Sequence, residues 1–256
     1  MLIPRTIPCL LLRNAGLVKT VNFKHPKYLG DPINIVKIFN EKEVDELVFL
    51  DITATTEGKR PPFELLEKVA GEAFMPLGYG GGIRSLEDVK TIFGLGIEKV
   101  VINSYAVENP LFISAVADFA GNQSVVVSMD VKKNFLGKYE VRTHRGTKET
   151  GLDPVAFAMN MENAGAGELI ITSIDRDGTM KGYDIDLIRR VTSAVHIPVV
   201  ACGGARTAQD LGAAIKQGGA SAAGAGSMFV FQGPHRAVLI NYPEYSELEN
   251  IFKEQS

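Results

Sequence analysis

The segment Val199-Val200-Ala201-Cys202-Gly203-Gly204-Ala205-Arg206-Thr207 decides the fold of this chain. Its apolar start predicts a short buried strand, its two glycines predict a tight turn, and Thr207 is a residue type that begins helices. A similar segment, Leu77-Gly78-Tyr79-Gly80-Gly81-Gly82-Ile83-Arg84-Ser85, occurs earlier in the chain. Strand, glycine turn and helix start therefore occur twice, in the same order.

A single offset of 122 residues relates the two segments and continues beyond them. The pairs matched at this offset are Gly81 with Gly203, Ser85 with Thr207, Asp88 with Asp210, and Gly96 with Gly218. Because this offset is close to half of the 256 residues, we expect two similar halves. Bare N–H groups in glycine turns suit a phosphate. Gly81-Gly82 and Gly203-Gly204 therefore predict a small-molecule ligand with a phosphate at each end.

The composition is that of a globular chain with one large core. Of 256 residues, 45% are hydrophobic and 22% are charged, and the net charge is −3. The length suits a (β/α)8 barrel, which typically has about 250 residues, and the charge argues against binding to nucleic acid or an anionic membrane. No apolar run approaches the roughly 18 residues of a membrane span, and residues 1–5 do not begin a signal peptide. We therefore expect a cytoplasmic protein.

Neither the cysteines nor the histidines form a metal-binding motif. Cys9 and Cys202 fall in predicted buried strands; they could pair, but reduced core thiols are expected in a cytoplasmic protein. The histidines are scattered along the chain at His25, His144, His196 and His235. No metal and no other cofactor is therefore expected.

Apolar runs and helix signals alternate along the whole chain. Strands are expected at 6–12, 46–52, from Leu77, and at 99–103, 124–130, 168–173, 198–202 and 221–225. Helices are expected after them, beginning at capping residues such as Asp31, Ser85, Asp184 and Thr207, with one more near the chain end. Small residues at the strand ends favour a closed (β/α)8 TIM barrel with two similar half-barrels over an open doubly wound sheet. No linker divides the chain, so residues 1–256 are predicted to be one domain.

Two polar stretches interrupt this alternation. Residues 13–31 are predicted to be a long loop, which is a common place for an active-site lid; a disordered surface excursion is the alternative. Residues 132–151 form a second insert, in which the alternation of Tyr139-Glu140-Val141-Arg142 indicates a small hairpin.

Asp130 is the candidate catalytic residue, because barrel enzymes place their chemistry at the C-terminal ends of the strands. It follows the run Val125-Val126-Val127-Ser128-Met129 and is expected directly at the barrel mouth. Burial there raises the pKa of a carboxyl group, which suits a general acid or base. A carboxylate that orients a loop through backbone N–H groups is the alternative, and the spacing supports both interpretations equally.

Other strand ends supply candidate phosphate ligands. Asn103-Ser104 and Gly226-Ser227 follow corresponding strands of the two halves, and their hydroxyls could bind phosphate or simply cap a helix. Asp177-Gly178-Thr179 could present N–H groups to the second phosphate. Asp51 and Asp175 also end strands, where loop capping is the favoured interpretation.

At the opposite ends of the strands lie four charged residues, Arg5, Glu46, Lys99 and Glu168. Charges at the bottom of a barrel usually serve stability. Two of each sign at equivalent places could instead form a ring around the barrel axis and give a small molecule an entrance.

With these residues in place, the chain resembles the cyclase subunit of imidazole glycerol phosphate synthase, a barrel of histidine biosynthesis. The resemblance spans roughly Arg5 to Phe231. It is carried by Asp45-Glu46-Leu47-Val48-Phe49-Leu50-Asp51-Ile52-Thr53-Ala54, by Gly80-Gly81-Gly82-Ile83, by Thr172-Ser173-Ile174-Asp175-Arg176-Asp177-Gly178-Thr179, and by Val18-Lys19 with Asn22-Phe23.

The resemblance implies a lyase-type reaction on a two-phosphate substrate derived from a ribonucleotide, bound across the barrel top with Lys19 among its ligands. It implies a glutaminase partner docked at the bottom, whose ammonia passes a charged gate and the barrel core. Arg5, Glu46, Lys99 and Glu168 match that gate. Asp130 matches one of the family's two catalytic aspartates.

The second catalytic aspartate of the family is absent, because Leu11 stands in its place in Pro8-Cys9-Leu10-Leu11-Leu12-Arg13. Leucine cannot transfer a proton, and losing a positioned acid or base typically costs about 10²–10⁴ in rate. The run Cys9-Leu10-Leu11-Leu12 and the tail 235–243 are similar to a branch of paralogues from surface-polysaccharide gene sets. These work with a glutaminase paralogue and a separate sugar amidotransferase; an ordinary final helix and strap is the alternative for the tail.

Three hypotheses follow. The leading one is an ammonia-conducting barrel subunit of a glutamine amidotransferase that supports conversion of an acetamido sugar to an acetamidino sugar in lipopolysaccharide. The second is a true cyclase of histidine biosynthesis, in which Asp130 makes both proton transfers. The third is a module without catalysis that only activates the glutaminase.

Overall fold

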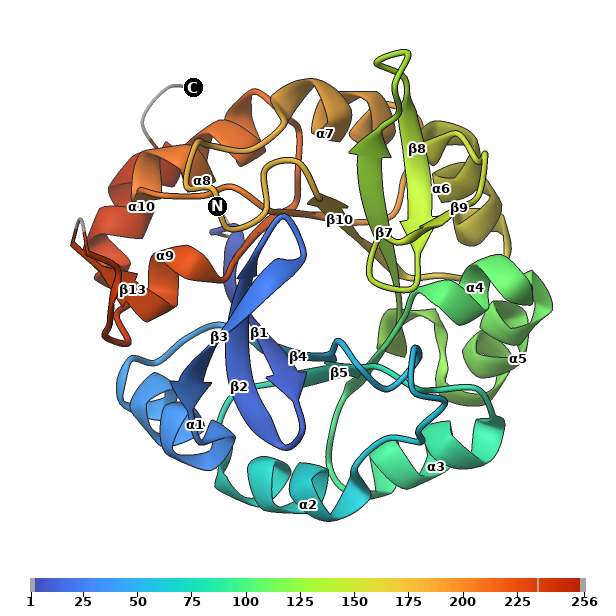
Figure 1. Ribbon diagram of the computed structural model, residues 1–256, viewed down its shortest axis with the longest axis horizontal. Helices are drawn as coiled ribbons and strands as arrows, with labels where there is room; N and C mark the ends of the chain where they lie inside the picture. Colours follow the sequence, from blue (N-terminus) through green and yellow to red (C-terminus); the bar gives the residue numbers. More distant parts are fainter. Residues whose placement is uncertain (1–2, 234, 254–256) are drawn as a thin grey trace.

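Eight parallel strands form a closed ring in the computed structural model, which describes residues 3–233 and 235–253 (Figure 1). They are β1 (Arg5–Arg13), β4 (Leu47–Asp51), β5 (Leu77–Gly80), β6 (Lys99–Ile102), β7 (Val125–Lys133), β10 (Glu168–Ser173), β11 (Val199–Cys202) and β12 (Ala222–Ala225). Each pairs with its neighbours, and the pairing of β7 with β10 closes the ring. The predicted (β/α)8 TIM barrel is confirmed; the ends of the predicted 1–256 domain and Pro234 lie outside the described residues.

A ring of helices surrounds the strands (Figure 1). The helices are α1 (Pro32–Glu41), α2 (Phe63–Glu72), α3 (Leu86–Gly94), α5 (Pro110–Ala120), α6 (Pro154–Asn163), α7 (Ile185–Thr192), α8 (Ala208–Lys216) and α10 (Tyr245–Lys253). Asp31, Ser85 and Asp184 each accept a hydrogen bond from an N–H of the first turn, as their positions in the sequence predicted. The predicted helix near the chain end is α10, which packs on α8.

Each half of the barrel has a helix that begins with the same kind of cap. In the first half, Ser85 Oγ accepts from the Asp88 N–H at 3.1 Å, and Asp88 accepts from the Arg84 N–H at 3.3 Å. In the second half, Asp210 accepts from the N–H groups of Arg206 and Thr207 at 2.9 and 3.0 Å. The repeat at an offset of 122 residues therefore reflects a repeated turn that aligns each glycine segment with the helix after it.

Two apolar cores flank the strands, because side chains alternate between the two faces of each strand. On β1, Ile7 and Cys9 face the barrel interior, whereas Leu10 and Leu12 pack against the helices. The interior cluster contains Ile7, Cys9, Val48, Val101, Val126, Ile170, Val200, Cys202 and Ala222. Its members are mostly small or β-branched, which suits the narrow lumen of an eight-stranded barrel.

The predicted loop at residues 13–31 is a β-hairpin instead. It consists of β2 (Gly16–Val21) and β3 (Lys24–Gly30), and β2 pairs antiparallel with the end of β1. Figure 1 shows this hairpin in front of the barrel centre. Lys19 and Thr20 are polar but buried. The polar composition of this segment therefore led to the wrong prediction of a loop, although it forms a strand at the mouth.

The second insert does form the predicted hairpin. Strand β7 continues past Asp130 and pairs with β8 (Tyr139–Thr143), which in turn pairs with the short β9 (Lys148–Glu149). The remaining short elements are α4 (Ser104–Glu108), η1 (Asn122–Ser124), α9 (Ser227–Val230), β13 (Phe231–Gln232) and β14 (Ala237–Val238). Helices α4 and α9 begin at the two candidate serines, Ser104 and Ser227, where a helix start was the alternative to phosphate binding.

Candidate active site and charged ring

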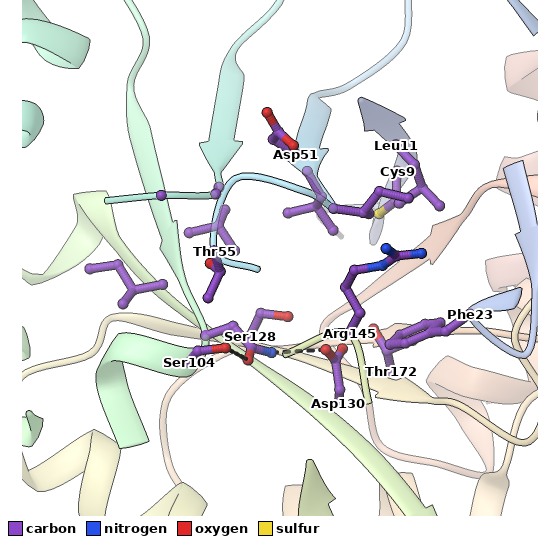
Figure 2. Close-up of a pocket in the computed structure, with 18 of the residues that line it drawn as sticks. Cys9, Leu11, Phe23, Asp51, Thr55, Ser104, Ser128, Asp130, Arg145 and Thr172 are labelled. Atoms are coloured by element: carbon purple, nitrogen blue, oxygen red, sulfur yellow. Dashed lines mark hydrogen bonds between the residues drawn. The ribbon is translucent and has the colours of Figure 1, made fainter. Parts of the chain in front are cut away.

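A pocket opens at the C-terminal ends of the strands (Figure 2). Strand ends and the residues directly after them line it, among them Leu11, Asp51, Gly81, Asn103, Asp130 and Thr172. Hairpin β2–β3 contributes Lys19 and Phe23, and the β8–β9 turn contributes Arg145. Candidates that are far apart in the sequence therefore meet in one cavity, as the barrel prediction required.

Asp130 lies in this pocket, and its carboxylate has one hydrogen-bond partner among the residues that the structure describes. Asn103 Nδ2 donates to Asp130 Oδ2 at 3.0 Å. Burial raises the pKa of Asp130 to about 7, the nearby Asp177 carboxylate adds to the rise, and the bond from Asn103 opposes it. No backbone N–H donates to the Asp130 carboxylate in the described residues, so the loop-orienting alternative has no support. A carboxyl that titrates near neutral pH can both accept and donate a proton.

Lys19 and Asp177 form a buried ion pair at the mouth. Lys19 Nζ lies 2.8 Å from Asp177 Oδ1, and Thr20 Oγ1 donates to Asp177 Oδ2 at 3.2 Å. The Asn22 N–H donates to the Asp177 carbonyl at 2.9 Å. These bonds fasten hairpin β2–β3 to the loop after β10. Lys19, which sequence reasoning placed at the site through the resemblance, is thereby held at the pocket wall.

The loop after β10 offers fewer N–H groups than predicted. The Asp177 N–H donates to the Ser173 carbonyl at 2.9 Å, and the Thr179 N–H donates to the Arg176 carbonyl at 3.0 Å. Among these three residues only Gly178 has no such backbone partner in the described chain. Its carbonyl accepts from Arg236 of the tail.

The glycine turns that follow β5 and β11 admit no side chain. Gly82 has φ +71° and Gly204 has φ +115°, both left-handed. A Cβ on Gly82 would collide with the Lys59 carbonyl, and one on Gly204 would collide with the Gly182 carbonyl. Gly81 and Gly82 line the pocket, whereas Gly203 and Gly204 are not among its lining residues. Phosphate binding at the two turns therefore stays a prediction.

The two candidate serines differ in their contacts. Ser104 Oγ accepts from the His144 N–H at 3.1 Å and donates to Asn103 Oδ1 at 3.3 Å. Ser227 Oγ is buried and has no hydrogen-bond partner among the described residues. An orphaned buried hydroxyl costs free energy, and a phosphate oxygen beside Gly226-Ser227 would remove that cost.

Leu11, Asp51 and Asp175 are not proton-transfer candidates in this geometry. Leu11 lines the pocket with an aliphatic side chain. Asp51 Oδ1 accepts from the N–H groups of Thr53 and Ala54 at 2.8 and 3.0 Å, and Asp175 accepts from the Lys133 N–H. Both aspartates therefore hold loops, which was the favoured interpretation.

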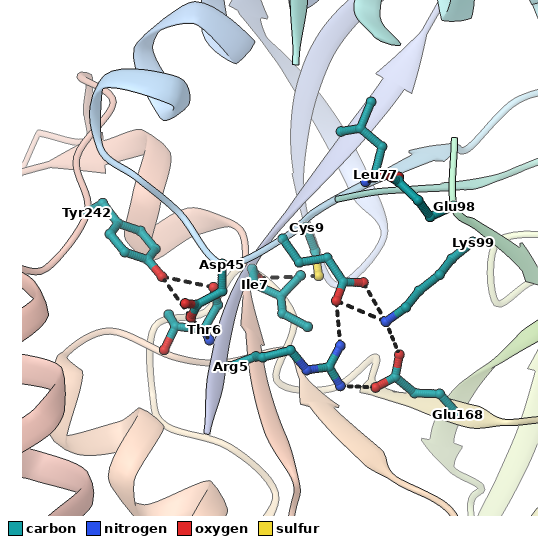
Figure 3. A network of polar contacts seen from close by, with 11 residues as sticks. Arg5, Thr6, Ile7, Cys9, Asp45, Leu77, Glu98, Lys99, Glu168 and Tyr242 are labelled. Atoms are coloured by element: carbon teal, nitrogen blue, oxygen red, sulfur yellow. Dashed lines mark hydrogen bonds and ion pairs between the residues drawn. The ribbon is translucent and has the colours of Figure 1, made fainter. Parts of the chain in front are cut away.

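At the opposite end of the barrel, four charged side chains close a ring (Figure 3). Lys99 Nζ lies 2.9 Å from Glu46 Oε2 and 2.8 Å from Glu168 Oε2. Arg5 pairs with the same two carboxylates. Burial lowers the pKa of Arg5, but its bonds to Glu168 and Glu46 outweigh this and raise it. All four predicted residues are thus brought together, with alternating charge.

Small and apolar side chains fill the space between ring and mouth. Cys9 and Cys202 are buried, unlinked thiols in the interior cluster, and a hydrogen bond between them together with burial raises the pKa of Cys9. Ser128 and Thr172 were not among the candidates, although both line the pocket. Ser128 lies two residues before Asp130 on one strand, and this spacing alone would have placed it on the same face.

Two absences concern the parts of the chain that the structure describes. Residues 3–233 and 235–253 contain no group of three or more His, Cys, Asp or Glu side chains arranged to hold a metal ion. Within the same ranges, no helix combines the length and apolar character needed to cross a membrane.

Comparison with known proteins agrees with this architecture. The family described as "Histidine biosynthesis protein" matches residues 5–235. The chain belongs to this family. The match to the histidine biosynthesis family spans every barrel strand and includes the four ring residues, the glycine turns and Asp130.

Three curated relatives that match most of this chain are named as synthase subunits. A Pseudomonas aeruginosa protein, provisionally named imidazole glycerol phosphate synthase subunit hisF2, is 52% identical over 245 residues, covering 96% of this chain and 98% of the relative. A Leptospira interrogans protein, provisionally named as the HisF subunit, is 49% identical, covering 98% of this chain and all of the relative. The imidazole glycerol phosphate synthase subunit HisF of Alkaliphilus metalliredigens is 45% identical, covering 90% of this chain and 91% of the relative.

Proposed function

We propose that this chain is the barrel subunit of a glutamine amidotransferase, which receives ammonia from a glutaminase subunit docked at the N-terminal face of the barrel. The ring of Arg5, Glu46, Lys99 and Glu168 carries the proposal. Replacing buried ion pairs by apolar side chains is often neutral or stabilising. Stability alone therefore does not explain a charged plug at this end of the barrel, whereas the entry of a small polar molecule does.

The interior beyond the ring suits neutral ammonia. Val48, Val101 and Val200 offer an apolar surface, on which a charged ammonium ion would be strongly disfavoured. Cys9, Cys202 and Thr172 add weakly polar groups toward the mouth. An apolar lumen that ends at a polar pocket delivers ammonia unprotonated, which is the nucleophilic form.

The mouth supports a reaction other than histidine-type cyclisation. Leu11 supplies no acid or base where the resemblance implies one, while the two glycine turns and Lys19 still suit a two-phosphate ligand. We infer that the chain supports formation of an acetamidino sugar for lipopolysaccharide, together with a separate sugar amidotransferase.

Asp130 favours a second candidate, the cyclase of histidine biosynthesis with lyase activity. Its pKa of about 7 allows one carboxyl to make both proton transfers near neutral pH. The 45% identical relative from Alkaliphilus metalliredigens bears the name of that synthase subunit.

The deciding experiment supplies ammonia directly to the isolated chain together with the histidine precursor, phosphoribulosyl aminoimidazole carboxamide ribonucleotide. Free ammonia removes the need for a glutaminase. We expect no turnover by the natural chain and a gain in Leu11→Asp, which restores a carboxyl at the mouth. Turnover by the natural chain at a rate equal to Leu11→Asp would assign it to histidine biosynthesis instead.

A further inference from the structure

Arg145 is a cation in the mouth that has no partner in the described chain. Its side chain lines the pocket, and Figure 2 shows its guanidinium directed into the cavity, away from the Asp130 carboxylate. No hydrogen bond and no ion pair to Arg145 occurs within residues 3–233 and 235–253. A guanidinium carries five N–H donors in a fixed fork, which suits carboxylate and phosphate oxygens.

The carboxylates around the pocket are all engaged elsewhere. Asp51 accepts from the loop that follows it, Asp177 pairs with Lys19, and Asp130 accepts from Asn103. Glu57 forms an ion pair with Lys59. Its bond to Lys59 lowers the pKa of Glu57, and the charge of Arg145 makes a smaller contribution in the same direction. Among the described residues, no carboxylate therefore forms an ion pair with Arg145.

The turn that carries Arg145 is tightly built. His144 and Arg145 have left-handed φ values of +52° and +59°. The His144 N–H donates to Ser104 Oγ at 3.1 Å, and Thr147 Oγ1 donates to the His144 carbonyl at 2.6 Å. A Cβ on Gly146 would stand 2.8 Å from Ile174 Cδ1, so the turn lies directly against the loop after β10.

The backbone at Arg145 is costly for its side chain. Non-glycine residues in the left-handed region cost of order 1 kcal/mol or more, and such strain gathers at functional sites. The turn before β2 has the same geometry but uses Asn14 and Ala15, which are exposed and small. Steric ease therefore does not explain a bulky, charged residue at this position over the pocket.

We propose that Arg145 binds an oxyanion of the ligand, a carboxylate or a further phosphate, in the pocket that Gly81 and Gly82 also line. The ligand then carries a third negative group besides its terminal phosphates. This inference rests on the two-phosphate part of the proposed function and is independent of ammonia conduction. Arg145 takes part in binding and in choice of ligand, and Asp130 remains free for proton transfer.

Two matched compounds test the proposal by calorimetry on the full chain. 6-Phosphogluconate and sorbitol 6-phosphate have the same length and one phosphate, but only the first ends in a carboxylate. We expect the natural chain to bind 6-phosphogluconate at least about tenfold more tightly, because a charge-assisted bidentate contact forms. Arg145→Met should abolish this preference and leave the affinity for sorbitol 6-phosphate unchanged.

Arg13→Gln is the matched control, since Arg13 is an exposed cation that does not line the pocket. It removes the same charge and should keep the preference. Equal binding of both compounds by the natural chain, or a preference that survives Arg145→Met, would overturn the assignment. A thermal unfolding curve checks that Arg145→Met is folded, which we expect because the Arg145 side chain has no hydrogen bond to any residue that the structure describes.

A second measurement decides the matter if neither compound binds. The Arg145 Nε–H signal in a nitrogen–proton spectrum, assigned by its loss in Arg145→Met, is titrated with malonate. The neutral diamide malonamide serves as the control. A saturable shift with malonate alone supports an oxyanion site at Arg145, whereas an unchanged signal, or an equal shift with malonamide, refutes it. Neither measurement involves a glutaminase, so this inference and ammonia conduction fail independently.

Discussion

The ammonium nitrogen of Lys99 lies 2.8 Å from a carboxylate oxygen of Glu168, although strand β7 separates the strands on which the two residues lie. The same nitrogen is 2.9 Å from Glu46 Oε2. One cation therefore bridges the barrel lumen at its N-terminal end. Glu46 and Glu168 are both nearly inaccessible to solvent, so their charges depend on Lys99 and Arg5 for compensation.

The substitution Lys99→Met should uncouple glutamine use from product formation. Two buried carboxylates would then share Arg5 alone, and their repulsion would open the ring where ammonia enters. In a complete system with glutaminase and acceptor enzyme, we expect the glutamate formed per amidinated sugar to rise severalfold.

The control for this substitution is Lys68→Met, which removes an exposed lysine of helix α2. It should leave the ratio of glutamate to product unchanged. Removing one partner of a buried pair typically costs about 3–5 kcal/mol, so the assay belongs at a temperature at which Lys99→Met remains folded. A folded Lys99→Met protein with a normal ratio would contradict entry of ammonia through the ring.

The substitution Asp130→Asn should stabilise the protein in a manner that depends on pH. The pKa of Asp130 rises from 3.8 to about 7 on folding. Between these values the unfolded chain has lost the proton that the folded chain keeps, so the natural protein loses stability as pH rises from about 4 to 7. Asparagine carries no such proton. Asp130→Asn should therefore gain up to about 4 kcal/mol above pH 7, and nothing below pH 4.

Urea unfolding at several pH values measures this difference. Asp118→Asn is the control, because Asp118 is an exposed carboxylate on helix α5. A constant difference between the natural chain and Asp130→Asn across the pH range would show that Asp130 is not desolvated.

Much of the barrel could be predicted from the sequence, because buried parallel strands appear as apolar runs and helix caps have distinct residue types. The segments at the edge of the mouth, hairpin β2–β3 and the turn that carries Arg145, could not be predicted in this way. Lys19 and Thr20 are polar yet buried, since Asp177 from a loop some 150 residues away compensates them. No local pattern reports such a partner, so strand β2 was predicted as a loop. Arg145 was missed for a related reason, because only the folded turn brings it over the pocket.

Lys19 and Asp177 should show strong energetic coupling. Lys19→Met leaves a buried carboxylate and Asp177→Asn leaves a buried ammonium, so each single change should cost about 3–5 kcal/mol. The double variant should cost clearly less than the sum, because neither charge is then left unpaired. Urea unfolding of all four proteins gives the coupling energy. Additive effects would mean that the pair is solvated and does not fasten hairpin β2–β3 to the barrel.

The glycine turn of the second half should tolerate no side chain. Gly204→Ala forces a Cβ against the Gly182 carbonyl on a left-handed backbone, and we expect a loss of about 2–4 kcal/mol. Gly71→Ala is the matched control. Gly71 lies in helix α2, and a Cβ there would meet no other atom within contact distance. Alanine at this position should therefore raise the free energy of unfolding by about 0.5–1 kcal/mol.

Phosphate binding separates the two roles of this turn. Inorganic phosphate, titrated at a temperature at which every variant is folded, should bind Gly71→Ala as it binds the natural chain. Gly204→Ala should bind it several times more weakly, because displaced backbone N–H groups no longer converge on one anion. If Gly204→Ala is destabilised but binds phosphate normally, the turn serves packing alone, and the ligand of the second half-barrel lies elsewhere in the mouth.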